Sequence, residues 1–183
     1  MESSGKGEVM KLIAFLGNPG REYRNTRHNA GFLIADHLYP SASWQKKFHG
    51  EYALENGMKL LKPQTYMNLS GVSVGEAASF FRLKPQEILV VHDDLELPFG
   101  VVRLQLGGGL QGHNGLRSIK ERLGSDQFAR LRFGIGRPQH GGVAPYVLMP
   151  FSKDEEIGWD LLLPHIRTMV EQCDTIPQIY KLP

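Results

Sequence analysis

Residues 87–94 read EILVVHDD, an apolar run that stops at a histidine followed by two aspartates. Residues 11–17, KLIAFLG, have the same form and lead into Asn18-Pro19-Gly20. Short runs that are almost entirely apolar are typical of strands buried on both faces of a parallel sheet. The two runs therefore predict an α/β fold with parallel strands at its centre.

The remaining segments alternate between strand and helix patterns. Asn56-Gly57 separates two short strands, at residues 49–54 and 58–62, and this dipeptide is a strong hairpin signal. Further strands are predicted at 101–106 and 129–135, and helices at 30–38, 70–81, 116–123 and 152–173. We expect a loose leader at residues 1–10 and a single α/β domain at 11–183. Its twisted mixed sheet would have parallel central strands flanked by helices on both faces.

Length and composition exclude several classes of protein. A chain of 183 residues has the length of one domain. Its hydrophobic content of 41% is too high for a disordered chain. The single cysteine, Cys173, excludes an internal disulfide framework and a multi-cysteine metal site. No apolar run approaches the roughly 20 residues of a membrane span, and no secretory signal is visible. We therefore expect a cytoplasmic protein with no membrane partner.

Charge is unevenly distributed along the chain, although the net charge is only +2. Residues 101–140 contain seven Lys and Arg against two acids, a net of +5, whereas residues 151–183 carry a net of −3 from three basic and six acidic residues. Basic residues gathered in one stretch fit a polyanionic partner, and an evenly solvated surface fits them equally well.

Polar side chains follow both apolar strands, where ligands bind in open α/β sheets. Asn18 follows the first strand, and His92-Asp93-Asp94 follow the second. Three other loops carry His28-Asn29, residues 66–68 (YMN) and His113-Asn114. A histidine beside a carboxylate can activate water, and asparagine can donate hydrogen bonds to an oxyanion. The alternative is that His28, Asn29, Asn68 and Asn114 only cap the helices that follow them.

Three short motifs suggest other chemistry. Residues 71–75, GVSVG, match the nucleophile elbow of α/β-hydrolases, but Ser73 falls inside a predicted helix instead of after a strand. Residues 107–112, GGGLQG, match a dinucleotide loop without the acid expected about 20 residues later, although their backbone N–H groups suit a phosphate. The HDD run lacks the histidine spacing of a metal site, so we expect no metal.

Five segments in order resemble the bacterial-type peptidyl-tRNA hydrolases. They are FLGNPGREYRNTRHNAGF (15–32), KPQTYMNLSG (62–71), EILVVHDDLELPFG (87–100), LGGGLQGHNGLRSI (106–119) and RLRFGIGRP (130–138). The resemblance implies a monomeric esterase without cofactor that cleaves the ester between a peptide and the 3′ ribose of tRNA, and so recycles tRNA. The partner would be peptidyl-tRNA, bound by its acceptor end and 3′ CCA.

The resemblance also implies a role for individual residues. His28 would be the catalytic base, Asp93 would stabilise its productive form, and Asn18 would distinguish N-blocked substrates. The residues matching substrate contacts are Tyr23, Tyr66, Met67, Asn68 and Asn114. Two departures from the family pattern are Leu110-Gln111, which replace His-Gly, and Gln105, which replaces a lysine that grips the tRNA 5′-phosphate together with the arginine matching Arg132.

The resulting hypothesis is direct attack by water, with His28 accepting its proton and no covalent intermediate. Two alternatives remain open: a Ser73-dependent hydrolase of small esters, and a non-catalytic RNA-binding module that uses the basic stretch.

Overall fold

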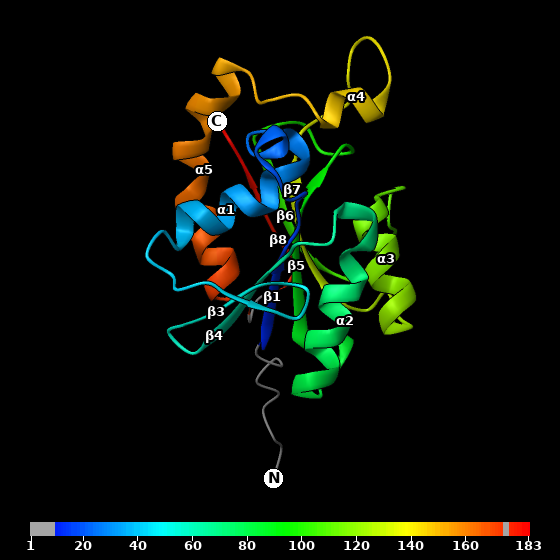
Figure 1. The fold of residues 1–183 in the computed structure, drawn as a ribbon. Coiled ribbons are helices and arrows are strands. Elements are labelled where there is room, and N and C mark those ends of the chain that lie inside the picture. The colour runs from blue at the N-terminus through cyan, green and yellow to red at the C-terminus, as the bar shows by residue number, and fades with distance from the viewer. Residues whose placement is uncertain (1–9, 174–175) are drawn as a thin grey trace.

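The computed structural model describes residues 10–173 and 176–183, which form a sheet covered by helices (Figure 1). Residues 1–9 of the expected leader lie outside the described residues, and Met10 packs against the core. In the described part of the chain, no helix is both long and apolar enough to cross a bilayer.

One sheet of eight strands forms the centre of the described residues, in the order β2-β3-β4-β1-β5-β7-β6-β8. The strands are β1 (Leu12–Phe15), β2 (Gln45–Lys47), β3 (Gly50–Glu55), β4 (Met58–Pro63), β5 (Ile88–Asp94), β6 (Val101–Leu106), β7 (Ala129–Gly134) and β8 (Gln178–Lys181). The central strands β4, β1, β5 and β7 run parallel, and the outer pairs are antiparallel. The predicted mixed sheet is therefore confirmed.

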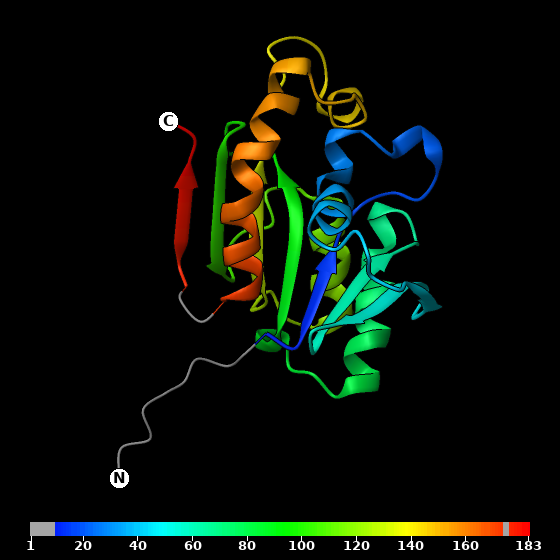
Figure 2. The same ribbon diagram turned by 90° about the vertical axis from the view of Figure 1, so that its left-hand side faces the viewer.

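Helices cover both faces of this sheet, as the two views show (Figures 1 and 2). The helices are α1 (Ala30–Leu38), α2 (Ser70–Phe81), α3 (Asn114–Leu123), α4 (Val143–Val147) and α5 (Lys153–Glu171). Helices α1 and α5 share one core with side chains such as Phe15, Val91 and Phe133. Helices α2 and α3 share the other core with Leu12, Val90 and neighbouring side chains. Because β1 and the first four residues of β5 alternate between two apolar layers, these stretches are apolar at every position.

Several predicted elements match the structure closely, including the helices at 30–38 and 70–81. The hairpin is also confirmed: Asn56 and Gly57 both have positive φ, 49° and 79°, as a type I′ turn requires. One prediction was wrong, because His92, Asp93 and Asp94 lie within β5 and do not follow it. These three residues continue the ladder by pairing with residues 132–134 of β7, so the strand is longer than its apolar run.

Candidate active site

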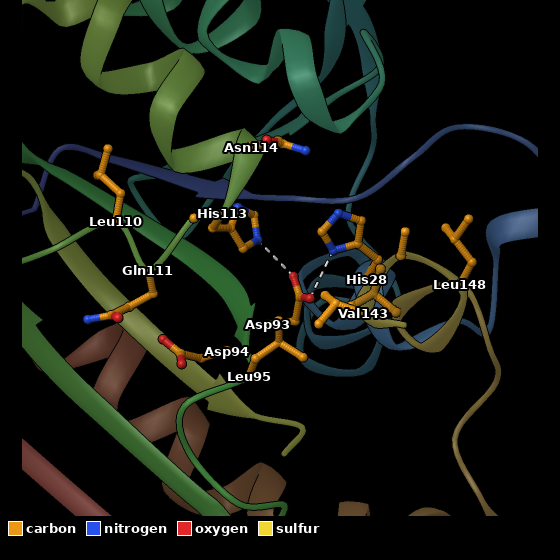
Figure 3. Close-up of a pocket in the computed structure, with 13 residues that line it drawn as sticks. His28, Asp93, Asp94, Leu95, Leu110, Gln111, His113, Asn114, Val143 and Leu148 are labelled. Carbon is orange, nitrogen blue, oxygen red and sulfur yellow. Dashed lines mark hydrogen bonds and ion pairs between the residues drawn. The ribbon is translucent and has the colours of Figure 1, made fainter. Parts of the chain in front are cut away.

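The site lies at the carboxyl ends of β1 and β5, where three segments meet (Figure 3). Asp93 is the penultimate residue of β5, and His28 comes from the 3₁₀ helix Arg27–Asn29 that precedes α1. His113 is the N-cap residue of α3. Residues distant in sequence thus converge on one carboxylate.

Asp93 binds one histidine with each carboxylate oxygen. His28 Nδ1 lies 2.8 Å from Asp93 Oδ2, and His113 Nε2 lies 2.9 Å from Asp93 Oδ1. Asp93 is only 2% exposed, whereas the His28 side chain is 15% exposed and lines the cavity described below. The carboxylate is therefore shielded from water while His28 remains open to a substrate.

The hydrogen bonds assign the proton on each ring. His113 Nδ1 accepts from the backbone N–H groups of Gly115 and Leu116, at 3.1 and 3.3 Å, so its proton is on Nε2 and is donated to Asp93. His28 donates its Nδ1 proton to the other oxygen of Asp93. His28 Nε2 is thereby left as an acceptor, which is the form that a general base needs.

Electrostatics reinforce this assignment. Burial lowers the pKa of His28, but the charge of Asp93 and its hydrogen bond outweigh that effect, and the pKa is raised above 6.5. Burial raises the pKa of Asp93, and the two histidines outweigh it, so the pKa falls well below its usual range. Asp93 therefore stays ionised wherever His28 titrates.

The same three residues must also be tested as a metal site, because their ligand atoms lie within 4.8 Å of one another. A metal at His113 Nε2 would displace the proton there, and Nδ1 could take that proton only by giving up the N–H groups of α3. The donor set thus favours hydrogen bonding over metal binding. The expectation of a metal-free site stays a prediction.

A cavity of about 400 Å³ opens beside His28. Its lining is largely apolar, with a few polar groups at one end. The residues are His28, Asp93, Asp94, Leu95, Leu110, Gln111, Gly112, His113, Asn114, Val143, Ala144, Val147 and Leu148. Figure 3 shows Val143 and Leu148 on the His28 side, and Leu110 and Gln111 across from them. An apolar pocket with the His28–Asp93 pair at its edge suits a ligand that carries apolar side chains.

Asn18 is held by both ends of the Asn29 amide. The backbone N–H of Asn18 donates to Asn29 Oδ1 at 2.8 Å, and Asn29 Nδ2 donates to the Asn18 carbonyl at 2.9 Å. Asn29 therefore does not cap α1 with its side chain, contrary to the capping alternative. Asn18 Oδ1 accepts from the Met67 N–H at 2.7 Å, so Asn18 presents Nδ2 as its free donor. It lines a neighbouring cavity of about 310 Å³ together with Arg21 and Arg24.

Of the other predicted contact residues, Met67 bonds Asn18 directly and Asn114 lines the cavity beside His28. Tyr23 and Tyr66 meet edge to face, with ring centroids 6.4 Å apart, and Met67 is buried. Asn68 and Asn114 are exposed, and Asn114 lines the cavity of about 400 Å³. Neither asparagine caps the following helix, because His113 caps α3 and the N-cap of α2 is Leu69.

Arg132 and Ser73, two residues with roles considered from the sequence, are both largely shielded from solvent. Arg132 Nε donates to Asp94 Oδ2 at 2.7 Å, and Arg132 Nη1 donates to Gln105 Oε1 at 3.0 Å. Its side chain is only 12% exposed, so any phosphate contact would compete with these bonds. Ser73 is fully buried within α2, and its hydroxyl has no hydrogen-bond partner in the described part of the chain. It therefore lacks both the access and the base that a nucleophile needs.

Comparison with known proteins decides the family. A family model described as peptidyl-tRNA hydrolase matches residues 12–179. The chain belongs to the peptidyl-tRNA hydrolase family. It is an enzyme that hydrolyses esters, and the family implies peptidyl-tRNA as its substrate.

Individual relatives agree over most of the chain. A peptidyl-tRNA hydrolase of Geotalea uraniireducens is 50% identical over 174 residues and covers 91% of each chain. That of Pelobacter propionicus is 56% identical over 166 residues, 86% of this chain and 83% of the relative. The crystal structure of peptidyl-tRNA hydrolase from Acinetobacter baumannii is 38% identical, covers 93% of each chain, and has a TM-score of 0.81.

His113 is the site residue that sequence reasoning missed. Its loop was noted as polar, but histidine is not among the usual N-cap residues. The signal was its place immediately before a helix, beside Asn114. A cap that uses Nδ1 necessarily leaves Nε2 pointing away from the helix, and here it reaches Asp93.

Proposed function

We propose that this hydrolase acts by direct attack of water, with His28 as the catalytic base. The observation that carries the proposal is the bond between His28 Nδ1 and the buried Asp93, which leaves Nε2 free at the edge of the cavity. Asp93 holds the imidazole in this form and stabilises the imidazolium that proton transfer creates. His113 fixes the opposite oxygen of Asp93 and so orients the carboxylate.

In the reaction, His28 Nε2 accepts one proton of water while the water oxygen bonds to the ester carbonyl carbon. The carbonyl electrons move to oxygen, and the resulting tetrahedral oxyanion collapses. The bond to the ribose oxygen then breaks, and this oxygen takes the proton from His28. The products are a peptide carboxylic acid and tRNA, and His28 returns to its starting state.

Asn18, Asn68 and Asn114 supply neutral hydrogen-bond donors for the substrate and for the tetrahedral oxyanion. Asn18 has its oxygen bound to the Met67 N–H, so only its Nδ2 group is available to a substrate carbonyl. Asn114 lies at the cavity, and Asn68 lies beside Met67 on the exposed surface. The Nδ2 group of Asn18 can donate to the amide carbonyl of an N-blocked residue. A free aminoacyl group has an ammonium in its place, which cannot accept, so the donor is left unpaired and this substrate is disfavoured.

Substrate placement follows from the chemistry of the surfaces. The largely apolar cavity of about 400 Å³ would take the peptide, and Tyr23 and Tyr66 offer ring faces for the 3′ CCA of the acceptor end. Exposed basic residues of α3 suit the phosphates of the tRNA: Arg117, Lys120 and Arg122. We further propose that the protein is a cytoplasmic monomer, since peptidyl-tRNA is formed during translation. Attack by water with His28 as the base requires no cofactor.

The test is turnover of matched N-acetylated and free aminoacyl-tRNA by the wild type and His28→Ala. Loss of the base should lower kcat by about 10²- to 10⁴-fold while tRNA binding persists. His49→Ala is the matched control, because His49 also bonds a carboxylate, Glu76, but on the surface. Turnover by folded His28→Ala at the wild-type rate would refute the assignment. Binding without turnover by the wild type would indicate an RNA-binding module.

A further inference from the structure

One wall of the cavity is formed by the α4 segment, residues 143–148, which lies outside the sheet layers (Figures 1 and 3). Val143, Ala144, Val147 and Leu148 of this segment line the cavity. Helix α4 has only five residues, too few to be stable alone in water. Contacts with the rest of the protein must therefore hold the wall in place.

Arg27, the residue directly before His28, makes two of these contacts. Its backbone N–H donates to the Met149 carbonyl at 3.0 Å, next to a bridge between Thr26 and Pro150. Its guanidinium carbon lies 4.3 Å from the centroid of the Tyr146 ring. The Tyr146 hydroxyl in turn donates to the Ile135 carbonyl at 2.6 Å, at the end of β7.

The Arg27 side chain is an enclosed cation, only 9% exposed. Its Nη2 bonds Glu155 Oε1 at 2.8 Å, and the same oxygen accepts from the Ser152 N–H at the start of α5. Arg27 Nε and Nη1 are buried and have no hydrogen-bond partner within the described residues. Two ring faces also stabilise this charge, that of Tyr146 at 4.3 Å and that of Phe151 at 5.9 Å, and the nearer one belongs to the α4 segment.

This geometry links the wall to the 3₁₀ helix Arg27–Asn29, which carries His28. If the α4 segment moved away, Arg27 would lose the Tyr146 ring at 4.3 Å and keep the Glu155 carboxylate and the more distant Phe151 ring, at 5.9 Å. The arginine therefore favours the position in which Val143 and Leu148 face the cavity. His28, in the same 3₁₀ helix, is held by the same anchor.

We propose that Arg27 is a positioning residue that fixes the α4 segment as a wall of the cavity and thereby sets a preference for substrates whose esterified amino acid has an apolar side chain. The proposal rests on the assignment of this cavity to the peptide. An apolar side chain of the substrate gains contact with the wall. Glycine has no side chain, so its hydrolysis should not depend on the position of the wall.

The experiment compares kcat/KM for N-acetyl-phenylalanyl-tRNA and N-acetyl-glycyl-tRNA. The wild type should favour the phenylalanyl substrate by roughly tenfold or more, the scale of selectivity of an apolar pocket. Arg27→Gln should lose most of that ratio, through a higher KM for the phenylalanyl substrate. Arg27→Lys keeps the charge without the planar group, so it should retain an intermediate ratio.

Arg167→Gln is the matched control. Arg167 also bonds a carboxylate, Glu171, and lies 5.9 Å from the Tyr39 ring, but far along α5 from the cavity. This variant should keep the wild-type ratio. A second pair leaves Arg27 itself unchanged. Tyr146→Phe keeps the ring face under the guanidinium but loses the bond to the Ile135 carbonyl, so it should retain most of the ratio, whereas Tyr146→Leu loses both and should lower it further.

The possible failures are distinguishable. A wild type that hydrolyses both substrates without preference would overturn the assignment of the cavity to the peptide, and this proposal with it. A wild-type preference that persists in folded Arg27→Gln and Tyr146→Leu would overturn the role of Arg27 alone. Equal loss for both substrates in these variants would also overturn it, because that result indicates general destabilisation.

Discussion

Replacing Asp93 by asparagine should remove most of the activity, although the imidazole of His28 remains. The sequence alone suggests a milder loss for that reason. The structure changes this expectation, because His113 can offer only its Nε2 proton toward position 93. An asparagine would turn its oxygen toward His113 and its amide N–H toward His28 Nδ1. His28 would then carry its proton on Nε2, which is the wrong tautomer for a base.

The magnitude follows from two effects of the 2.8 Å contact between His28 and Asp93. A base in the wrong tautomer loses the contribution of general-base catalysis, about 10²- to 10⁴-fold. Loss of the carboxylate charge also lowers the pKa of His28, because the charge and hydrogen bond of Asp93 are what raise it, and the imidazolium is then less stabilised. We therefore expect Asp93→Asn to approach the loss seen in His28→Ala.

The assay is kcat on N-acetylated aminoacyl-tRNA for Asp93→Asn, His113→Asn and the double variant. Asparagine at 113 can still cap α3 but removes the imidazole donor. In the double variant the amide at position 93 is free to present its oxygen to His28, so activity should recover at least about tenfold over Asp93→Asn, a gain of about 1.4 kcal/mol. A double variant no more active than Asp93→Asn would refute the tautomer argument.

Three further outcomes are expected. Because the neutral form of His28 is the base and its pKa is raised above 6.5, kcat/KM should rise with pH with a midpoint above 6.5; a midpoint below 6.5 would contradict the assignment. Ser73→Ala removes a buried hydroxyl without a partner, so stability should change by less than about 1 kcal/mol and activity should persist; labelling of Ser73 by a fluorophosphonate would instead support the serine hydrolase. Gln105→Lys should lower KM for tRNA carrying its 5′-phosphate and steepen the log–log salt dependence by about 0.7–0.9; equal KM values with and without that phosphate would place the contact away from Arg132 and Gln105.

Sequence patterns predicted the elements whose stability is local or whose burial is complete. Residues 11–17 and 87–91 were identified as strands because both of their faces are buried. By contrast, β2 is three exposed polar residues, Gln45–Lys47, that become a strand only by pairing with β3. Helix α4 contains Pro145 and depends on Tyr146 and Arg27 for its position, which no local pattern reports. The missed elements are those that tertiary contacts create.

The candidate site was predictable to the same extent. Asp93 and His28 were found because strand ends and loop histidines are recognisable in sequence. Only the family resemblance implied His28 as the base; the residue patterns alone do not choose between His28 and His113, and both rings contact Asp93 at nearly equal distances. The fold makes this choice through the N-terminus of α3, which occupies Nδ1 of His113 and so commits its only proton to Asp93. The His28 ring bonds Asp93 through Nδ1, and its second nitrogen, Nε2, has no hydrogen-bond partner among the described residues. Of two similar histidines, only His28 therefore has a nitrogen that can receive a proton from water.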